Sequence, residues 1–152
     1  NVFFGESKAK QDADDLNAAI ELSQAKEFVD KLPGGTAHHI AQMGRNVSGG
    51  QKQRLSIARA LARKPEILIF DDSFSALDYR TDARLREGLE EQLHGTTKII
   101  VAQRISTIRH ADKIIVLERG EAVGIGTHEE LMQNCDVYRE IAYSQLSAAE
   151  LA

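Results

Sequence analysis

The sequence predicts an α/β fold in which strands alternate with helices around a parallel sheet. Apolar strand patterns at 67–70, 98–102 and 113–117 are separated by helical patterns, and this order and spacing predict right-handed crossovers. The first of these runs, "ILIF", is unbroken, which is typical of a strand buried on both faces in a parallel sheet. The first 65 residues show only helical patterns, which predicts a separate helical subdomain on the N-terminal side.

Before the first strand, apolar residues at helical spacing predict helices at 12–23, 25–32 and 50–63. The first helix has acidic residues in its first turn, the letters "PGG" end the second helix, and Pro65 ends the third. The pattern from Thr36 to Val47 is irregular, so we expect a loop there. Three helices joined by loops are therefore expected ahead of the sheet.

After the first strand, a helix is predicted at 81–93, where leucines recur every four residues until Gly95. A short helix follows around 106–109. The letters "ERGE" predict a hairpin turn from the strand at 113–117 into "AVGIGT". Thr127 and Glu130 form a capping-box pattern for a helix at 128–134, and we expect Asp136 to cap a last helix that ends in a loose tail.

Composition limits the classes of function. A chain of 152 residues with 42% hydrophobic and 28% charged residues suits one globular domain or a large piece of one. Its net charge of −4 does not suggest a nucleic-acid binder. No run of 18 apolar residues is present, so these residues are not expected to cross a membrane. The opening "NVFFGES" lacks Met, and we interpret the sequence as a fragment of a longer polypeptide.

Two short patterns suggest a phosphate or metal site. Asp71 and Asp72 follow the apolar strand directly, and adjacent carboxylates at a buried strand are costly unless a cation lies beside them. The letters "SGGQ" at 48–51 begin a helix, where unpaired N–H groups and the helix dipole favour an anion. Glycine there lets a phosphate approach without a Cβ in the way. The paired histidines His38 and His39 lack metal-ligand spacing and are expected to be solvated.

The segment 46–78, "NVSGGQKQRLSIARALARKPEILIFDDSFSALD", resembles the signature motif and Walker B segment of ATP-binding cassette (ABC) proteins. "IIVAQRIST" at 99–107 occupies the switch-loop position, and 111–131 is similar to the closing hairpin and helix. The resemblance is dense up to about Tyr143. It is looser before Asn46, where "NVFFGE" and "LPGG" fit the helical subdomain of exporter-type cassettes.

The resemblance implies a partial P-loop NTPase-like parallel sheet. It divides the chain into a helical signature subdomain at 1–64, the C-terminal part of the ATPase core at 65–144, and a tail at 145–152. It also implies ATP and Mg²⁺ as cofactors. The residues implied to contact nucleotide are Ser48, Gly49, Gly50, Gln51, Asp71, Ser75 and Asp78. Asp71 is the implied metal residue, and Asp72 and Gln103 occupy the catalytic positions.

Two of these positions depart from the family pattern. Hydrolytic cassettes usually carry Glu where this chain has Asp72, which is shorter by about 1.5 Å. A misplacement of about 1 Å can cost on the order of a hundredfold in rate. The family normally has His at the position of Gln103, and an amide cannot carry a positive charge or shuttle a proton as imidazole does. The sequence therefore predicts a degenerate site that binds ATP and hydrolyses it slowly or not at all.

The family works as head-to-tail pairs, and the signature at 48–51 is intact. We therefore expect one half of a heterodimer, in a bacterial multidrug-type exporter with a transmembrane domain, at the cytoplasmic face of the cell membrane. No Gly is followed by Lys, so the P-loop pattern is absent; the fragment, itself soluble, is expected to be inactive alone. Two alternatives remain open: a soluble ABC ATPase of DNA repair or translation type, and a non-catalytic dimerisation module.

Overall fold

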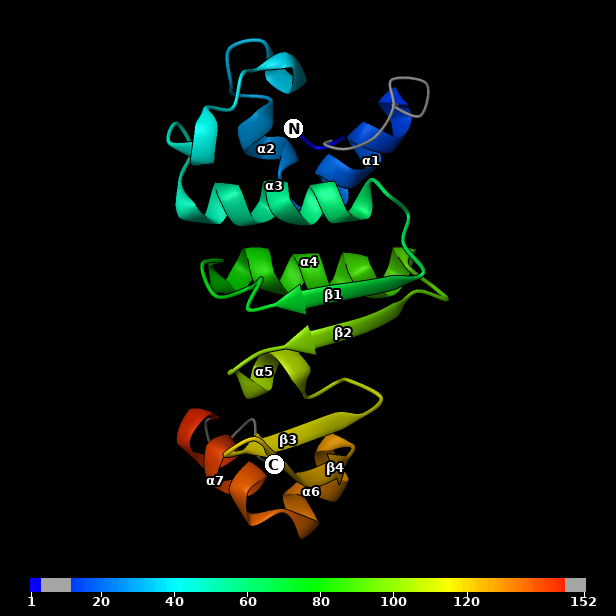
Figure 1. Ribbon diagram of the computed structural model, residues 1–152, viewed down its shortest axis with the longest axis vertical. Coiled ribbons are helices and arrows are strands. Elements are labelled where there is room, and N and C mark those ends of the chain that lie inside the picture. The colour runs from blue at the N-terminus through cyan, green and yellow to red at the C-terminus, as the bar shows by residue number, and fades with distance from the viewer. Residues whose placement is uncertain (4–11, 147–152) are drawn as a thin grey trace. The chain divides into compact units, whose positions relative to one another are not determined.

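The computed structural model describes residues 1–3 and 12–146, and it confirms the predicted α/β class (Figure 1). The chain forms two compact units, Asn1–Ile99 and Ile100–Ala152. Parts of two sequence predictions, residues 4–6 of "NVFFGE" and the tail from 147 onward, lie outside the described residues. The predicted domain boundaries at 64 and 144 stay predictions. Within the described ranges, no helix combines the length and the apolar character needed to cross a membrane.

The helical part of the first unit contains α1 (Ala13–Leu22), α2 (Lys26–Val29) and α3 (Gly49–Leu61), as predicted. Asp12 begins α1 by accepting a hydrogen bond from the Asp14 amide at 2.7 Å. Helix α2 is shorter than predicted, because the amides of Lys31 and Leu32 bond to carbonyls only three residues back. Two 3₁₀ helices, η2 (Gly35–Ala37) and η3 (Gln42–Gly44), lie in the segment predicted as loop.

Arg54 connects α3 to the turn between α1 and α2. The Arg54 guanidinium donates to the Gln24 carbonyl at 2.8 Å, and its central carbon lies 4.8 Å from the centroid of the Phe28 ring. Leu55 packs beside it in a core cluster that includes Ile20. A cation over an aromatic face adds to a hydrogen bond made at the same residue, so the start of α3 is held against the two shorter helices.

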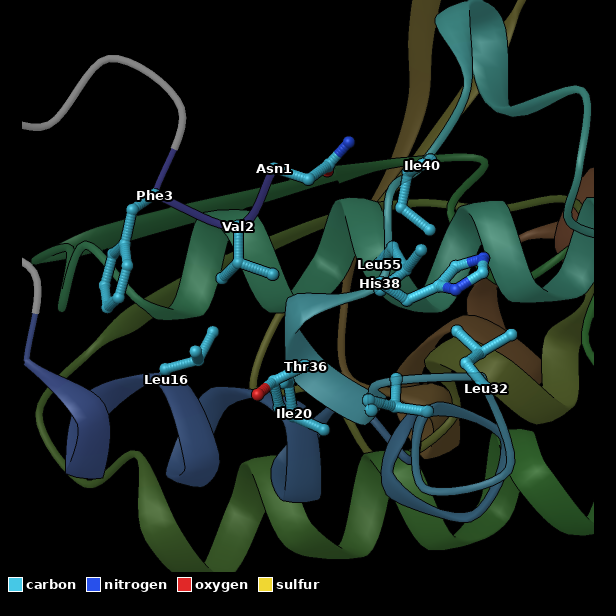
Figure 2. Close-up of a pocket in the computed structure, with 12 residues that line it drawn as sticks. Asn1, Val2, Phe3, Leu16, Ile20, Leu32, Thr36, His38, Ile40 and Leu55 are labelled. Carbon is cyan, nitrogen blue, oxygen red and sulfur yellow. The ribbon is translucent and has the colours of Figure 1, made fainter.

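The helical part of the first unit contains a cavity of about 220 Å³, which Figure 2 shows. The apolar side chains of Leu16, Ile20, Leu32 and Leu55 line it, together with His38. The His38 ring is held within the chain, because its Nδ1 lies 2.9 Å from the Pro33 carbonyl oxygen, which can only accept. This contact gives His38 a local structural role.

The first unit also contains β1 (Ile67–Asp71) and α4 (Tyr79–Gln92), which leads to β2 (Thr97–Val101). The two strands form one sheet, and their arrows run in the same direction in Figure 1. The prediction that β1 is buried on both faces is wrong for this chain. Leu68 and Phe70 are buried, but Ile67 is 59% exposed and Ile69 is 64% exposed, because no described residue covers that face.

The second unit contains α5 (Ile105–Ile108), β3 (Ile114–Glu118), β4 (Glu121–Gly126), α6 (His128–Asn134) and α7 (Asp136–Gln145). Strands β3 and β4 pair antiparallel, which confirms the predicted hairpin. Arg119 and Gly120 at the turn have φ values of 51° and 86°. Two successive positive φ values are typical of the type I′ turn, whose twist matches that of the flanking strands.

One face of this hairpin and the two helices after it form the core of the second unit. Ile114 and Val116 pack with Leu131, Tyr138 and Ala142. The predicted capping box is confirmed, since the hydroxyl of Thr127 accepts from the Glu130 amide at 3.3 Å and the Glu130 carboxylate accepts from the Thr127 amide at 2.9 Å.

The predicted cap at Asp136 is wrong. Cys135 occupies the capping position of α7, where no side chain caps the helix, and Asp136 is the first helical residue. Its carboxylate pairs with Arg139 one turn later. An acidic residue in the first turn of a helix interacts favourably with the helix dipole. Asp136 therefore indicated the start of α7 correctly, although it does not occupy the capping position.

The buried Tyr138 predicts an alkaline limit for the second unit. Its ring is 1% exposed, its hydroxyl lies 2.8 Å from His128 Nδ1, and burial raises the pKa of Tyr138 to about 12. Because this pKa is higher in the folded than in the unfolded chain, the contribution to stability is complete below about pH 10. It is lost as pH rises through about 12.

An absorbance titration of tyrosinate in the 152-residue chain measures this. We expect one tyrosine to ionise late, and Tyr138→Phe to remove that late step. Simultaneous ionisation of all three tyrosines while circular dichroism shows an intact fold would contradict the burial of Tyr138.

Candidate nucleotide site

The letters "SGGQ" form the start of α3, and Ser48 is its cap. We call residues 48–51 the signature turn, after the motif that they resemble. The Gln51 amide donates to the Ser48 hydroxyl at 3.3 Å, and the Ser48 amide donates to the Gln51 side-chain oxygen at 2.9 Å. Gln51 is therefore occupied in local capping. The amides of Gly49 and Gly50 have no carbonyl four residues back within the helix. Together with the helix dipole, these amides favour an anion at this end of α3.

The two glycines differ in what surrounds them. A Cβ on Gly49 would meet nothing within 4 Å, so this side of the turn is open. A Cβ on Gly50 would lie 3.0 Å from the carbonyl oxygen of Ala76. Gly49 thus has open space beside it, and Gly50 allows α3 to come close to the segment after β1.

The adjacent carboxylates lie at the C-terminal end of β1. Asp71 is the last residue of the strand, and its exposed carboxylate makes no hydrogen bond or ion pair among the described residues. Ligand sites of α/β sheets lie at the C-terminal ends of strands. The described residues contain no group of three His, Cys, Asp or Glu side chains able to hold a metal ion. A magnesium ion at Asp71 would take its other oxygen ligands from water and phosphate, which this ion prefers.

Asp72 begins the turn that leads to α4. Its φ of 48° lies in the left-handed region, which Asp tolerates better than most residues. The Asp72 carbonyl accepts from the Ser75 hydroxyl at 3.0 Å and from the Ser75 amide at 3.4 Å. The Asp72 side chain is exposed, so the turn is fixed through its main chain and leaves the carboxylate accessible.

Gln53 on α3 joins the signature turn to this segment, in an arrangement that the sequence did not indicate. Its side-chain oxygen accepts from the Ala76 amide at 3.0 Å. Its side-chain nitrogen lies 3.2 Å from the Ser75 hydroxyl and 3.4 Å from the Asp72 carbonyl. We call these contacts the Gln53 bridge. They span 19 to 23 positions along the chain, and no periodic pattern in the sequence identifies them.

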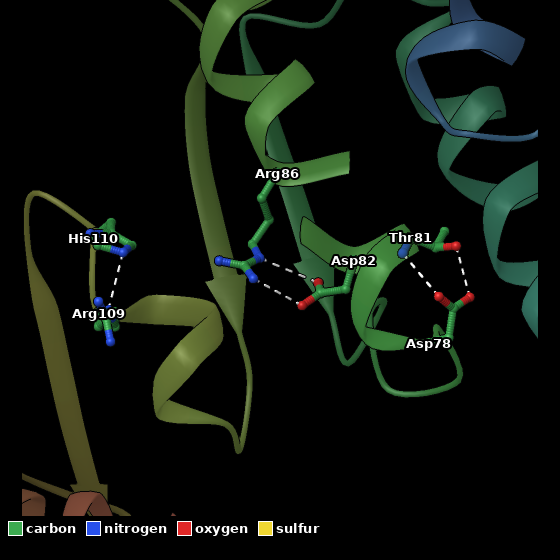
Figure 3. A network of polar contacts seen from close by, with 6 residues as sticks. All are labelled: Asp78, Thr81, Asp82, Arg86, Arg109 and His110. Atoms are coloured by element: carbon green, nitrogen blue, oxygen red, sulfur yellow. Dashed lines mark hydrogen bonds and ion pairs between the residues drawn. The ribbon is translucent and has the colours of Figure 1, made fainter. Parts of the chain in front are cut away.

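Asp78 begins α4 and is also occupied locally, as Figure 3 shows. Its carboxylate accepts from the Thr81 hydroxyl at 2.7 Å and from the Thr81 amide at 3.0 Å. These two hydrogen bonds hold the pKa of the Asp78 carboxyl below its usual value. One residue after Thr81, the buried Asp82 pairs with Arg86 at 3.1 Å (Figure 3). The first turn of α4 is thus fixed by its own acidic residues.

The structure brings together the signature turn, Asp72 and Ser75 within the first unit. Gln103 lies in the second unit, after β2, and its side chain is exposed. The Gln103 carbonyl accepts a hydrogen bond from the side-chain nitrogen of Gln145 at 2.8 Å. Gln145, like Gln53, was not identified from the sequence.

Known proteins match this chain over nearly its whole length. The ABC transporter family matches residues 2–75. A putative ABC transporter ATP-binding protein of Mycoplasma genitalium is 46% identical over 130 residues, which are 86% of this chain and 21% of that protein. A putative export ATP-binding/permease protein of Rickettsia felis is 42% identical over 147 residues, which are 97% of this chain and 25% of that protein.

A solved structure agrees in both sequence and fold. The structure of a bacterial Atm1-family ABC exporter with ATP bound is 33% identical, with a TM-score of 0.89 over 96% of this chain and 25% of that chain. The chain therefore spans about a quarter of the length of these relatives. Together with the open signature turn and the carboxylates at the end of β1, these matches identify the chain as part of an ATP-binding domain homologous to those of ABC exporters.

Proposed function

We propose that this chain is the signature-bearing part of an ATP-binding domain in a heterodimeric exporter, where ATP binding and hydrolysis drive export. The observation that carries the proposal is the open first turn of α3 at Gly49, in a chain 33% identical to an exporter solved with ATP bound. The names of the export ATP-binding/permease relatives support a transmembrane domain, with this part at the cytoplasmic face of the membrane. They also favour an exporter over a soluble ABC ATPase.

In this proposal the signature turn contacts an ATP molecule that the partner half holds. Ser48 fixes the helix end, Gly49 leaves room for a phosphate, and the amides of Gly49 and Gly50 face it. The bound nucleotide supplies the phosphoanhydride bond, and Mg²⁺ offsets its negative charge. Asp71 has a free carboxylate suited to orient the water shell of that ion.

The second part of the proposal is that this chain's own site is degenerate. The Asp72 carboxylate is one methylene shorter than the Glu of hydrolytic cassettes, and Gln103 is neutral where they carry His. Such a site would keep ATP bound in a structural role and hydrolyse it slowly or not at all. These 152 residues contain no P-loop pattern, so alone they would neither bind ATP tightly nor hydrolyse it.

The first prediction tests this asymmetry in the full-length chain with its partner. Ser48→Arg should abolish ATP turnover, with a loss of more than about a hundredfold, because bulk and charge replace the open turn. Asp72→Ala should change turnover by less than about twofold, since this site contributes little hydrolysis. Ser56→Arg, on the exposed part of the same helix, is the matched control and should leave turnover unchanged. Equal losses from Ser48→Arg and Asp72→Ala would show that both sites hydrolyse ATP.

A second prediction separates the two glycines. Alanine is a better helix former than glycine by about 1 kcal/mol, and Gly49 has free space, so Gly49→Ala should not lower the free energy of unfolding. Gly50→Ala should be less stable than Gly49→Ala by roughly 1 to 3 kcal/mol, because its Cβ meets the Ala76 backbone. Chemical denaturation of the two variants measures this difference. Turnover of the full-length pair should nevertheless fall with Gly49→Ala, and a fully active Gly49→Ala variant would contradict the phosphate contact.

A third prediction concerns the reversal of the degenerate site. With the partner's catalytic Glu removed, Asp72→Glu or Gln103→His alone should raise ATP hydrolysis only slightly, because groups that act as a unit are strongly non-additive. The double variant should exceed the product of the two single gains, measured as single-turnover rates. A double variant as slow as either single one would show that these residues do not limit the rate.

A further inference from the structure

Gln145, the last residue of α7, contacts the switch segment, which we define as residues 103–105. Its side-chain nitrogen donates to the Gln103 carbonyl at 2.8 Å, and its side-chain oxygen accepts from the Ile105 amide at 2.9 Å. One amide group thus uses both its donor and its acceptor on two main-chain groups that are two residues apart. Such a pair of contacts fixes both the position and the direction of the backbone between them.

The Ile105 amide needs this contact. Ile105 is the first residue of α5, where an amide has no intrahelical partner. Arg104 occupies the capping position, and its side chain makes no capping hydrogen bond. The Gln145 oxygen therefore caps α5 from another helix. A helix of four residues has little stability of its own, so α5 depends on contacts with the rest of the unit, and this hydrogen bond is one of them.

Both ends of the contact are anchored in the core of the second unit. Ile105 is 3% exposed and packs in the same cluster as Ala142, one turn before Gln145 on α7, and Leu146, the residue that follows the helix. The Leu146 amide closes the helix by donating to the Ala142 carbonyl at 2.8 Å. The Gln145 side chain therefore projects from a fixed helix end onto a fixed segment.

We propose that Gln145 is a positioning residue, which holds the main chain of Gln103 through the end of α7. This inference deepens the proposed function, because it assigns Gln103 to the nucleotide and rests on that assignment. In this proposal the side chain of Gln103 faces the nucleotide, and its main-chain carbonyl accepts the hydrogen bond from Gln145. The C-terminal helix is thus part of what determines the geometry of the switch segment.

Two substitutions in the full-length protein separate the two contacts. Gln145→Leu removes both of them. Gln145→Glu keeps an oxygen that can accept from the Ile105 amide, but it can no longer donate to the Gln103 carbonyl and places a negative charge beside it. Gln92→Glu, at an exposed glutamine on α4, makes the same change of charge away from this contact and serves as the control.

Hydrogen exchange is the first readout. The loss of one hydrogen bond predicts roughly two- to tenfold faster exchange at the Ile105 amide in Gln145→Leu. The Ile105 amide should stay protected in Gln145→Glu and in Gln92→Glu. Unchanged exchange at Ile105 in Gln145→Leu would overturn the proposal. Uniformly faster exchange along the whole of α7 would also overturn it, because that result indicates general destabilisation.

ATP kinetics is the second readout, in the Asp72→Glu, Gln103→His background with the partner's catalytic Glu removed. Both Gln145 variants should lower kcat by roughly ten- to hundredfold, as expected for a misplacement of about 1 Å, and change KM less than twofold. An unchanged kcat would overturn the positioning role. If the background itself does not hydrolyse ATP, the assignment of the site under the proposed function fails. The exchange pattern then decides alone whether Gln145 positions the segment.

Discussion

The arrangement of the candidate site depends on the contact between the start of α3 and the turn after β1. The Gln53 bridge holds this contact through the Ala76 amide at 3.0 Å and the Ser75 hydroxyl at 3.2 Å. The contact requires a glycine at position 50, because a Cβ there would lie 3.0 Å from the Ala76 carbonyl oxygen. Each of these hydrogen bonds contributes roughly 0.5 to 1.5 kcal/mol to stability, and together they hold the two segments in one arrangement. The start of α3 and the turn after β1 are thus held together within the first unit.

Each of the two sheets has one covered face and one exposed apolar face. In β1, Ile67 and Ile69 are exposed, and in the hairpin Ile115 and Ile125 are 57% and 61% exposed. Exposed apolar strand faces of this kind mark surfaces that other polypeptide covers. The unbroken apolar run in β1 therefore predicted the strand correctly but not its burial, because Ile67 and Ile69 are exposed while Leu68 and Phe70 are buried.

Local patterns in the sequence were sufficient to predict most elements. Helices α1, α3 and α4, the β3–β4 hairpin and the capping box at Thr127 follow from periodicity and from residues close together in the chain. The failures have physical reasons. Asp136 has the right residue type for a cap, yet the helix already includes it, and its carboxylate pairs with Arg139. Gln53 and Gln145 look like ordinary polar residues of helix surfaces, because their partners are determined by tertiary packing across 19 to 42 positions.

Asp72 and Gln103, the two residues proposed to make the site degenerate, share one structural feature. In each, the main-chain carbonyl accepts a hydrogen bond from a glutamine on another helix, Gln53 for Asp72 and Gln145 for Gln103. Both side chains are exposed, so neither carries the packing that holds its own backbone. A change of the Gln103 side chain therefore leaves this main-chain support in place, whereas at Asp72 the left-handed φ of 48° favours Asp over most other residues. In the proposed function, hydrolysis at this site can therefore be changed through the Gln103 side chain while the main-chain contact with Gln145 is kept.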